Sequence, residues 1–115
     1  MSNPPRAKGT KAETALVDYL RAAGWPDAGR LPLQGRFDKG DVAWVPWLAC
    51  EVKNVRAPRV AEWLREAETE RRNRGATFGV VVHKPHGVAL TNQGLWHVHL
   101  TLDTFAGIIR LLEGR

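Results

Sequence analysis

The chain has almost no cysteine and no long hydrophobic run, and each absence excludes a class of protein. Its single cysteine, Cys50, cannot form an internal disulfide or a multi-cysteine zinc site within one chain. No window has the uninterrupted apolar length of a membrane span, and the N-terminal residues lack the apolar segment of a secretory signal. The sequence therefore predicts a protein without a membrane segment, in a reducing, cytoplasmic setting.

Length and charge bound the domain count and the class of partner. The 115 residues are enough for one domain with one modest core. We expect a flexible basic lead-in at residues 1–8 and a single domain at residues 9–115. A formal net charge of +5 favours nucleic acid or another anionic surface but identifies neither.

Hydrophobic periodicity and turn residues predict alternating helices and strands. A first helix is expected from Thr10 to about Ala23, with Thr10 and Glu13 as a capping box and Gly24 after its end. The remaining elements expected are strands at 30–34, 41–45, 48–54 and 77–83, a helix at 58–74, an extended piece at 88–90, a strand at 95–100, and a helix at 104–112 capped by Thr101 or Asp103. This order predicts an α/β fold with a mixed central sheet flanked by helices.

The two central strands contain charged residues that are costly to bury unless they are paired or bound to metal. These are Asp41, Glu51 and Lys53. Glu51 and Lys53 share one strand face by alternation. Asp41 joins them only if the hairpin loop has an odd number of residues, for example Val45 to Trp47.

Two carboxylates on one face make a hard oxygen site for Mg²⁺, with Mn²⁺ able to substitute. The Lys53 ammonium beside such an ion can orient or help deprotonate a metal-bound water, and it can offset charge in the transition state of phosphodiester hydrolysis. The alternative is an ordinary Glu/Lys pair on an exposed sheet face, which contributes little.

Glu13 and the histidines each allow two interpretations. Glu13 lies on the apolar face of its helix. Its carboxylate either folds back to the Thr10 amide as part of the capping box or points towards Glu51. His97 and His99 share a strand face, whereas His83 and His86 flank a turn. With no H-x-x-x-H spacing and no cysteine partner, we interpret the histidines as sheet-surface or turn residues rather than as a zinc site.

The pairing of Gly40-Asp41 with Glu51-Val52-Lys53, after a helix that carries Glu13, resembles the PD-(D/E)XK nuclease superfamily. The segments 8–13, 51–54 and 79–84 are most similar to archaeal-type Holliday junction resolvases and related small bacteriophage nucleases. The superfamily's proline before the aspartate is glycine in this chain. Its glutamine on the second helix has no clear match, and Glu62 and Glu66 are the nearest polar residues.

The resemblance implies a restriction-endonuclease-like αβββαβ core and a magnesium-dependent, structure-selective DNA endonuclease. Asp41, Glu51 and the Val52 carbonyl would bind Mg²⁺, Lys53 would position the attacking water, and Glu13 would join the site. Such an enzyme would act as a homodimer on branched DNA, in a bacterial, archaeal or phage-infected cell. Basic residues that could contact DNA phosphates are Lys8, Lys11, Arg30, Arg36, Lys39 and Lys84.

Two other functions stay open at this point. The same chemistry suits a restriction-like, flap or repair nuclease, because fold does not fix substrate. A non-catalytic nucleic-acid-binding module on the same fold is the alternative from another class.

Overall fold

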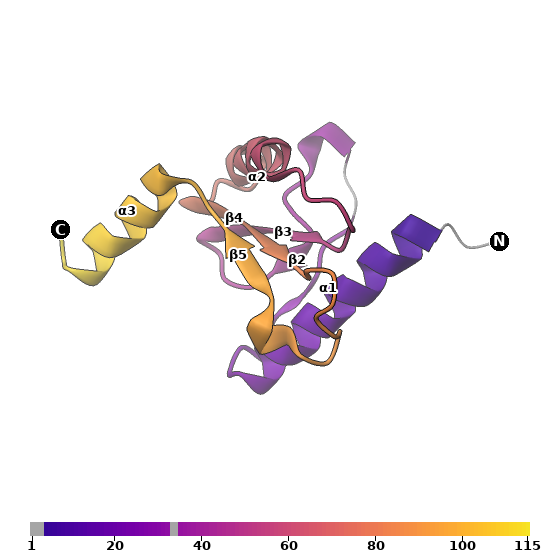
Figure 1. Ribbon diagram of the computed structural model, residues 1–115. Helices are drawn as coiled ribbons and strands as arrows, with labels where there is room; N and C mark the ends of the chain where they lie inside the picture. The colour runs from indigo at the N-terminus through magenta and orange to yellow at the C-terminus, as the bar shows by residue number, and fades with distance from the viewer. Residues whose placement is uncertain (1–3, 33–34) are drawn as a thin grey trace.

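Five strands form one mixed sheet in the computed structural model, which describes residues 4–32 and 35–115 (Figure 1). The elements in chain order are α1 (Pro4–Ala22), β1 (Gly29–Arg30), the short 3₁₀ helix η1 (Gly35–Phe37), β2 (Val42–Ala43), β3 (Leu48–Lys53), α2 (Val60–Arg74), β4 (Phe78–His83), the short 3₁₀ helix η2 (Gln93–Leu95), β5 (His97–His99) and α3 (Leu102–Leu112).

The strands lie side by side in sequence order, β1 to β5. Neighbours pair antiparallel except β3 and β4, which are parallel and are joined by the crossover helix α2. A parallel pair needs such a crossover, because its second strand must start at the same end as the first. The predicted α/β class, with a mixed sheet and helices on its faces, is confirmed.

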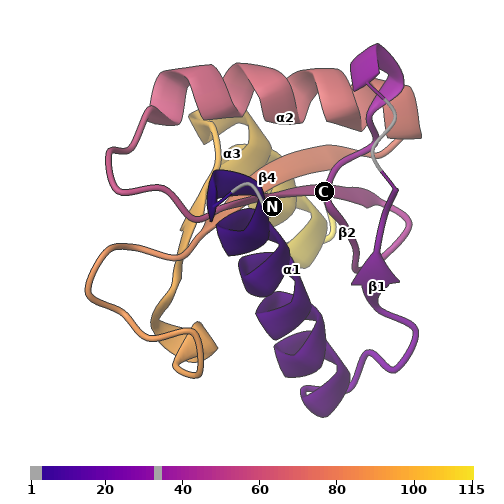
Figure 2. The same cartoon turned by 90° about the vertical axis from the view of Figure 1, so that its right-hand side faces the viewer.

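The two faces of the sheet are covered by different helices, with α2 on one side and α1 on the other (Figures 1 and 2). On the α1 face, Leu16 and Leu20 pack into one apolar cluster with Cys50 and Val52. On the α2 face the apolar cluster is smaller and centres on Trp63, Ala67 and Val81. The larger core therefore lies between α1 and the sheet.

A glycine in β4 allows α2 to lie close to the sheet. A Cβ atom added to Gly79 would lie 2.7 Å from the carbonyl oxygen of Ala67 and 3.3 Å from the Arg71 Cβ. Any other residue at this position would push α2 outward, because real Cβ atoms do not approach a backbone oxygen this closely.

Helix α1 starts earlier than predicted, at Pro4 rather than at Thr10. Thr10 is therefore inside the helix, where it cannot form the predicted capping box with Glu13. Residues 4–8, expected to be a flexible lead-in, belong to this helix, and the rest of the lead-in lies outside the described residues. Proline is well tolerated in a first helical turn, and this property fits the start at Pro4.

The outer strands are shorter than predicted. The expected strand at 30–34 is reduced to Gly29–Arg30, and its last two positions lie outside the described residues. Residues 88–90 form turns rather than an extended piece. The strand expected at 95–100 begins only at His97, because Gln93–Leu95 forms η2 and the Trp96 indole donates to the Ala89 carbonyl at 3.2 Å.

The end of α2 and the start of α3 carry the capping residues that the sequence predicts. Gly75 takes the left-handed conformation after α2, and its N–H donates to carbonyls of the last turn. Thr101 is the N-cap of α3 and accepts a hydrogen bond from the Thr104 N–H, which decides between the two predicted caps.

Helix α3 extends away from the body of the molecule (Figure 1). Its apolar side chains are only partly covered: Ile108 packs against the core, but Leu102 is 80% exposed and Leu112 is 83% exposed. Among the described residues, no helix is both long and apolar enough to cross a membrane.

Candidate metal centre

The β2–β3 hairpin has the register that brings its charged residues together. Val42 lies opposite Cys50, so the loop between the strands has an odd number of residues and is centred on Pro46. Val42 and Cys50 point into the α1 core, and Asp41 and Glu51 take the other face. Their carboxylates, with that of Asp38, lie within 4.8 Å of one another.

The Asp41 side chain is fixed by the main chain of β3. The Val52 N–H donates to Asp41 Oδ2 at 2.8 Å, and the Asp41 N–H donates to the Cys50 carbonyl at 2.9 Å. The Lys53 carbonyl accepts from Lys84 on the opposite side of β3. Since main-chain groups alternate sides along a strand, the Val52 carbonyl also faces the Asp41 side.

Helix α2 adds two glutamates from above the sheet. Glu66 Oε2 accepts from Lys53 Nζ at 2.8 Å, and this ammonium lies 3.6 Å from Glu51 Oε1. Glu70 is buried beside Glu51. A pocket of about 320 Å³ opens between α2 and the hairpin, lined by Gly35, Asp38, Glu51, Glu66, Thr69, Glu70 and Asn73.

Crowding of carboxyls in a buried place raises their pKa values. Burial, followed by the charge of Glu51, raises the pKa of Asp41 to about 8. Burial and the contact with Glu70 raise the pKa of Glu51 to about 9, and burial raises that of Glu70 to about 7. Both effects disfavour the charged form, so the site holds protons near neutral pH unless a cation replaces them.

Lys53 keeps its charge in the same surroundings. Burial alone would lower its pKa, but the hydrogen bond to Glu66 and the charge of Glu51 together raise it above the usual value. The side chain is therefore an ammonium at neutral pH, able to donate hydrogen bonds but not to accept a proton.

Two carboxylate oxygens in the site are buried without a hydrogen-bond partner among the described residues: Glu51 Oε2 and Glu70 Oε2. Buried polar atoms are nearly always satisfied, so two such oxygens beside a carboxylate cluster fit a site that can hold a cation. Asp38, Asp41 and Glu51 are positioned to bind a metal ion. An all-oxygen set suits a hard divalent cation such as Mg²⁺ or Mn²⁺.

Glu13 is not part of this cluster. Its Oε1 accepts from Arg30 Nε at 3.0 Å, in a second pocket that the first turns of α1 line together with Arg30 and Pro32. Neither of its predicted partners, the Thr10 amide or the Glu51 side, engages it through a hydrogen bond in the described part of the chain. Its charge still contributes, as the smallest of the causes, to the raised pKa of Asp41.

The predicted DNA-contacting residues whose side chains are described come from α1, β1, the loop before β2 and the end of β4. Lys8, Lys11 and Lys39 are exposed, and Arg30 is held by Glu13. Lys84 lies at the end of β4, where its N–H donates to the Lys53 carbonyl at 2.9 Å. The Arg36 side chain lies outside the described part of the structure.

Sequence reasoning missed Asp38 and Glu70. In the sequence, Glu70 and Arg74 have the i, i+4 spacing of a surface ion pair, but Glu70 is buried and the Arg74 guanidinium donates to the Val45 carbonyl at 3.4 Å. A signal existed in the spacing: Glu70 continues the buried stripe of Trp63 and Ala67 at helical intervals. The i+4 charge pattern with Arg74 concealed it.

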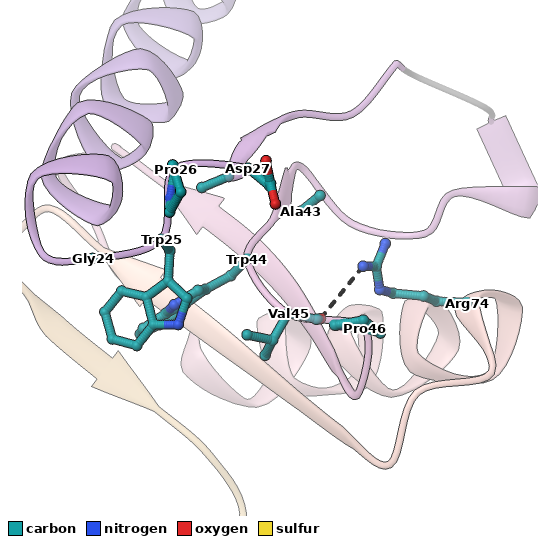
Figure 3. Close-up of a pocket in the computed structure, with 10 residues that line it drawn as sticks. Gly24, Trp25, Pro26, Asp27, Ala43, Trp44, Val45, Pro46 and Arg74 are labelled. Atoms are coloured by element: carbon teal, nitrogen blue, oxygen red, sulfur yellow. Dashed lines mark hydrogen bonds between the residues drawn. The ribbon is translucent and has the colours of Figure 1, made fainter.

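A larger pocket of about 500 Å³ lies on another part of the surface, between the turn after α1 and the hairpin (Figure 3). Trp25 and Trp44 meet edge to face there, with ring centroids 5.1 Å apart. Asp27 is the one acidic residue lining it, so it lacks the converging carboxylates of the smaller pocket.

Comparisons with models of protein families, with curated proteins and with solved structures found no match for this chain. What the site can do is therefore inferred from its own side chains. They offer an oxygen-rich cation site with a fixed ammonium at its edge, a combination suited to hydrolysis of an anionic ester.

Proposed function

We propose that the protein is a magnesium-dependent DNA endonuclease of the PD-(D/E)XK type that acts on branched DNA, as Holliday junction resolvases do. The observation that carries the proposal is the convergence of Asp41 and Glu51 from neighbouring strands, with the Lys53 ammonium 3.6 Å from Glu51. The helix and strand order is also compatible with a restriction-endonuclease-like αβββαβ core followed by a further strand and helix.

The residues present fit a hard cation, and each has a distinct role. Asp41, Glu51 and the Val52 carbonyl would hold the ion, with Asp38 within reach of the same place. A bound Mg²⁺ supplies a Lewis acid and lowers the pKa of water. Asp41 is kept in position by the Val52 N–H, so its other oxygen remains available.

Lys53 would act as a hydrogen-bond donor and not as a general base. Its raised pKa keeps it charged, so it would orient the attacking water through a hydrogen bond and offset negative charge that builds up on the phosphate. Glu66 holds this ammonium in place and takes the position of the polar residue expected on the second helix.

The substrate part of the proposal rests on charge and on an uncovered helix. Lys11, Lys39 and Lys84 can contact phosphates on either side of a cut. Symmetric cleavage of a four-way junction needs two active sites, hence a two-fold dimer of a chain this short. The exposed apolar residues of α3, such as Phe105 and Leu112, offer a surface for that contact.

The test is a cleavage panel with Mg²⁺ on a four-way junction, a flap, linear duplex and single strand. Wild type is compared with Glu51→Gln and Lys53→Gln, and with Glu68→Gln as a matched control on the outer side of α2. We expect junction cleavage that falls at least about a hundredfold in the two site variants and stays unchanged in the control.

Equal cleavage of all four substrates would remove the resolvase assignment and favour a nuclease of broader substrate range. DNA binding with no cleavage in either Mg²⁺ or Mn²⁺ would support the non-catalytic module instead. Cleavage that survives in Glu51→Gln would overturn the proposed site.

A further inference from the structure

Three of the four histidines gather beside the carboxylates on the α2 face of the sheet. Strand pairing puts His83 next to Lys53 on one side and opposite His97 on the other. One step along the strands, His99 lies opposite Val81. Since side chains paired across a sheet point to the same face, His83, His97 and His99 form one group.

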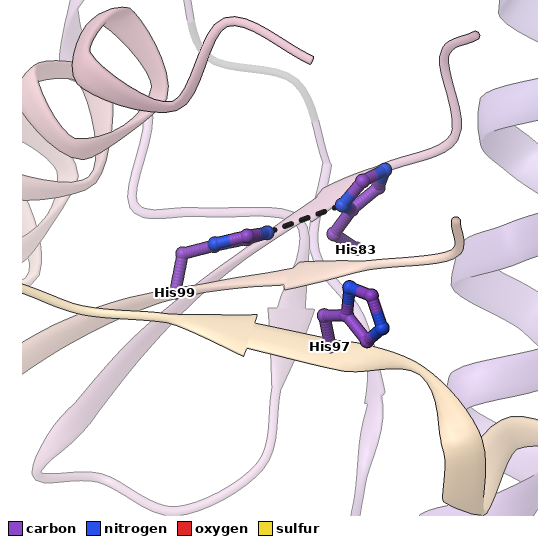
Figure 4. Close-up of side chains that lie close together, drawn as sticks. All are labelled: His83, His97 and His99. Atoms are coloured by element: carbon purple, nitrogen blue, oxygen red, sulfur yellow. Dashed lines mark hydrogen bonds between the residues drawn. The ribbon is translucent and has the colours of Figure 1, made fainter. Parts of the chain in front are cut away.

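The three rings are close enough to share an ion. One ligand nitrogen of each lies within 4.8 Å of the others, and His83 Nδ1 is 3.1 Å from His99 Nε2 (Figure 4). Two nitrogens on one tetrahedral zinc ion are about 3.3 Å apart, given Zn–N bonds of about 2.0–2.1 Å. The pair thus already has the spacing of two zinc ligands.

His83 is not the turn residue that its sequence neighbours suggest. It is 4% exposed, and its Nε2 is buried without a hydrogen-bond partner among the described residues. The Trp63 ring covers it at a centroid distance of 4.9 Å. The ring is therefore held in one place, with Nδ1 turned towards His99.

Two of the three histidines, His83 and His99, have pKa values shifted towards the neutral form that binds metals. Burial, followed by the charges of His99 and His97, lowers the pKa of His83, and burial lowers that of His99. Both rings are therefore neutral at neutral pH, as coordination requires.

We propose that His83, His97 and His99 form a second metal site, specific for a zinc-class ion and separate from the carboxylate centre. Imidazole nitrogens suit Zn²⁺ and related transition metals, whereas Mg²⁺ requires oxygen ligands. His97 is exposed, so the fourth position of the ion opens to solvent.

A hydrogen bond explains the short contact between His83 and His99, and strand pairing places His97 directly opposite His83, so the backbone brings all three rings together before any ion binds. Bound metal would join β5, which has only three residues at the sheet edge, to β4. The site would therefore stabilise the edge strand from which α3 continues.

The experiment is calorimetric titration of Zn²⁺, with Co²⁺ absorption as a second readout, into protein kept in excess Mg²⁺. The Mg²⁺ occupies the carboxylates. Variants are His97→Ala and His99→Ala, which lie at exposed or half-buried positions and spare the buried His83. His86→Ala is the matched histidine control, and Asp41→Asn separates the two centres.

We expect one Zn²⁺ per chain, weakened at least about tenfold in His97→Ala and His99→Ala and unchanged in His86→Ala and Asp41→Asn. Wild-type affinity in both cluster variants would overturn the site. Loss of zinc binding in Asp41→Asn alone would overturn it too, because the ion would then belong to the carboxylates. No DNA is involved, so the result is independent of the proposed nuclease activity.

Discussion

The two faces of one sheet differ in what they bury. Against α1, the side chains of β3 and β4 are apolar, and Cys50 and Val52 pack on leucines. Against α2, the same two strands present Glu51, Lys53 and His83. Two adjacent strands therefore contribute to an apolar layer on one side and to a layer of charged and histidine side chains, with the candidate metal centre, on the other.

Strand alternation separates the apolar side chains that stabilise the fold from the charged and histidine side chains of the candidate metal sites. Each residue of β3 belongs to one layer or the other, so a change on one face leaves the opposite face in place. The α1 face gains free energy by burying apolar area, whereas the α2 face loses some by burying carboxyls. The following predictions test this separation, beginning with the largest effect.

Leu20→Ala should lower the free energy of unfolding by about 2–5 kcal/mol, because Leu20 is fully buried in the α1 core and its loss leaves a cavity. Urea unfolding monitored by tryptophan fluorescence measures it. Leu95→Ala is the matched control, expected within about 0.5 kcal/mol because that leucine is 62% exposed and lies outside α3. Equal losses in the two variants would contradict the assigned core.

Raising the pH should destabilise the metal-free protein. The raised pKa values of Asp41, Glu51 and Glu70 mean that the folded state holds protons that the unfolded state has released. Stability is therefore full below the unfolded carboxyl pKa of about 4 and falls as the pH rises through about 7 to 9.

The free energy of unfolding should fall steadily between pH 5 and pH 9, by about 1.4 kcal/mol per pH unit for each carboxyl that is protonated only in the folded state. Unfolding in urea with EDTA at each pH measures it. Glu51→Gln should be the more stable protein at pH 9, while Glu68→Gln should follow the wild type. A stability that rises with pH in this range would refute the electrostatic account.

Mg²⁺ should restore the stability lost at pH 8. An ion that binds only the folded state stabilises it by about 2.7 kcal/mol at a hundred times its dissociation constant. Thermal unfolding with and without Mg²⁺ measures the gain. The gain should disappear in Asp41→Asn and persist in His97→Ala, which lies on the same face but in the other cluster.

Glu13→Gln should have the smallest effect, because this carboxylate acts on Asp41 only through its charge. We expect a loss of cleavage below about tenfold, equivalent to less than about 1.4 kcal/mol. Single-turnover cleavage with saturating Mg²⁺ measures it. A loss as large as that of Glu51→Gln would place Glu13 in the candidate metal centre after all.

The features that the sequence predicted correctly depend on local patterns. Periodicity and turn residues located α2 and β4, and the chain order implied the mixed sheet. The odd-length loop around Pro46 was a stated condition for joining Asp41 to Glu51, and the register meets it. Strand alternation then placed Lys53 beside Glu51.

The features that were missed depend on tertiary contact. Glu70 looked like one member of a surface ion pair, because the sequence does not show how near α2 lies to the sheet. His83 looked like a turn residue, because its pairing with His97 arises only when β5 folds back along β4. The early start of α1 also needed more than the capping motif, which placed the start at Thr10.

Gly79 sets a dimension of the metal centre without contributing an atom to it. The absent side chain lets α2 lie close to β4 at Ala67, and Glu66 comes directly before Ala67 and Glu70 about one turn after it. The distance between α2 and the sheet therefore depends on this glycine. A methyl group at this position would push α2 away from the sheet and move both glutamates away from Lys53 and Glu51. The separation between the α2 glutamates and the hairpin carboxylates is therefore set by a residue that has no side chain.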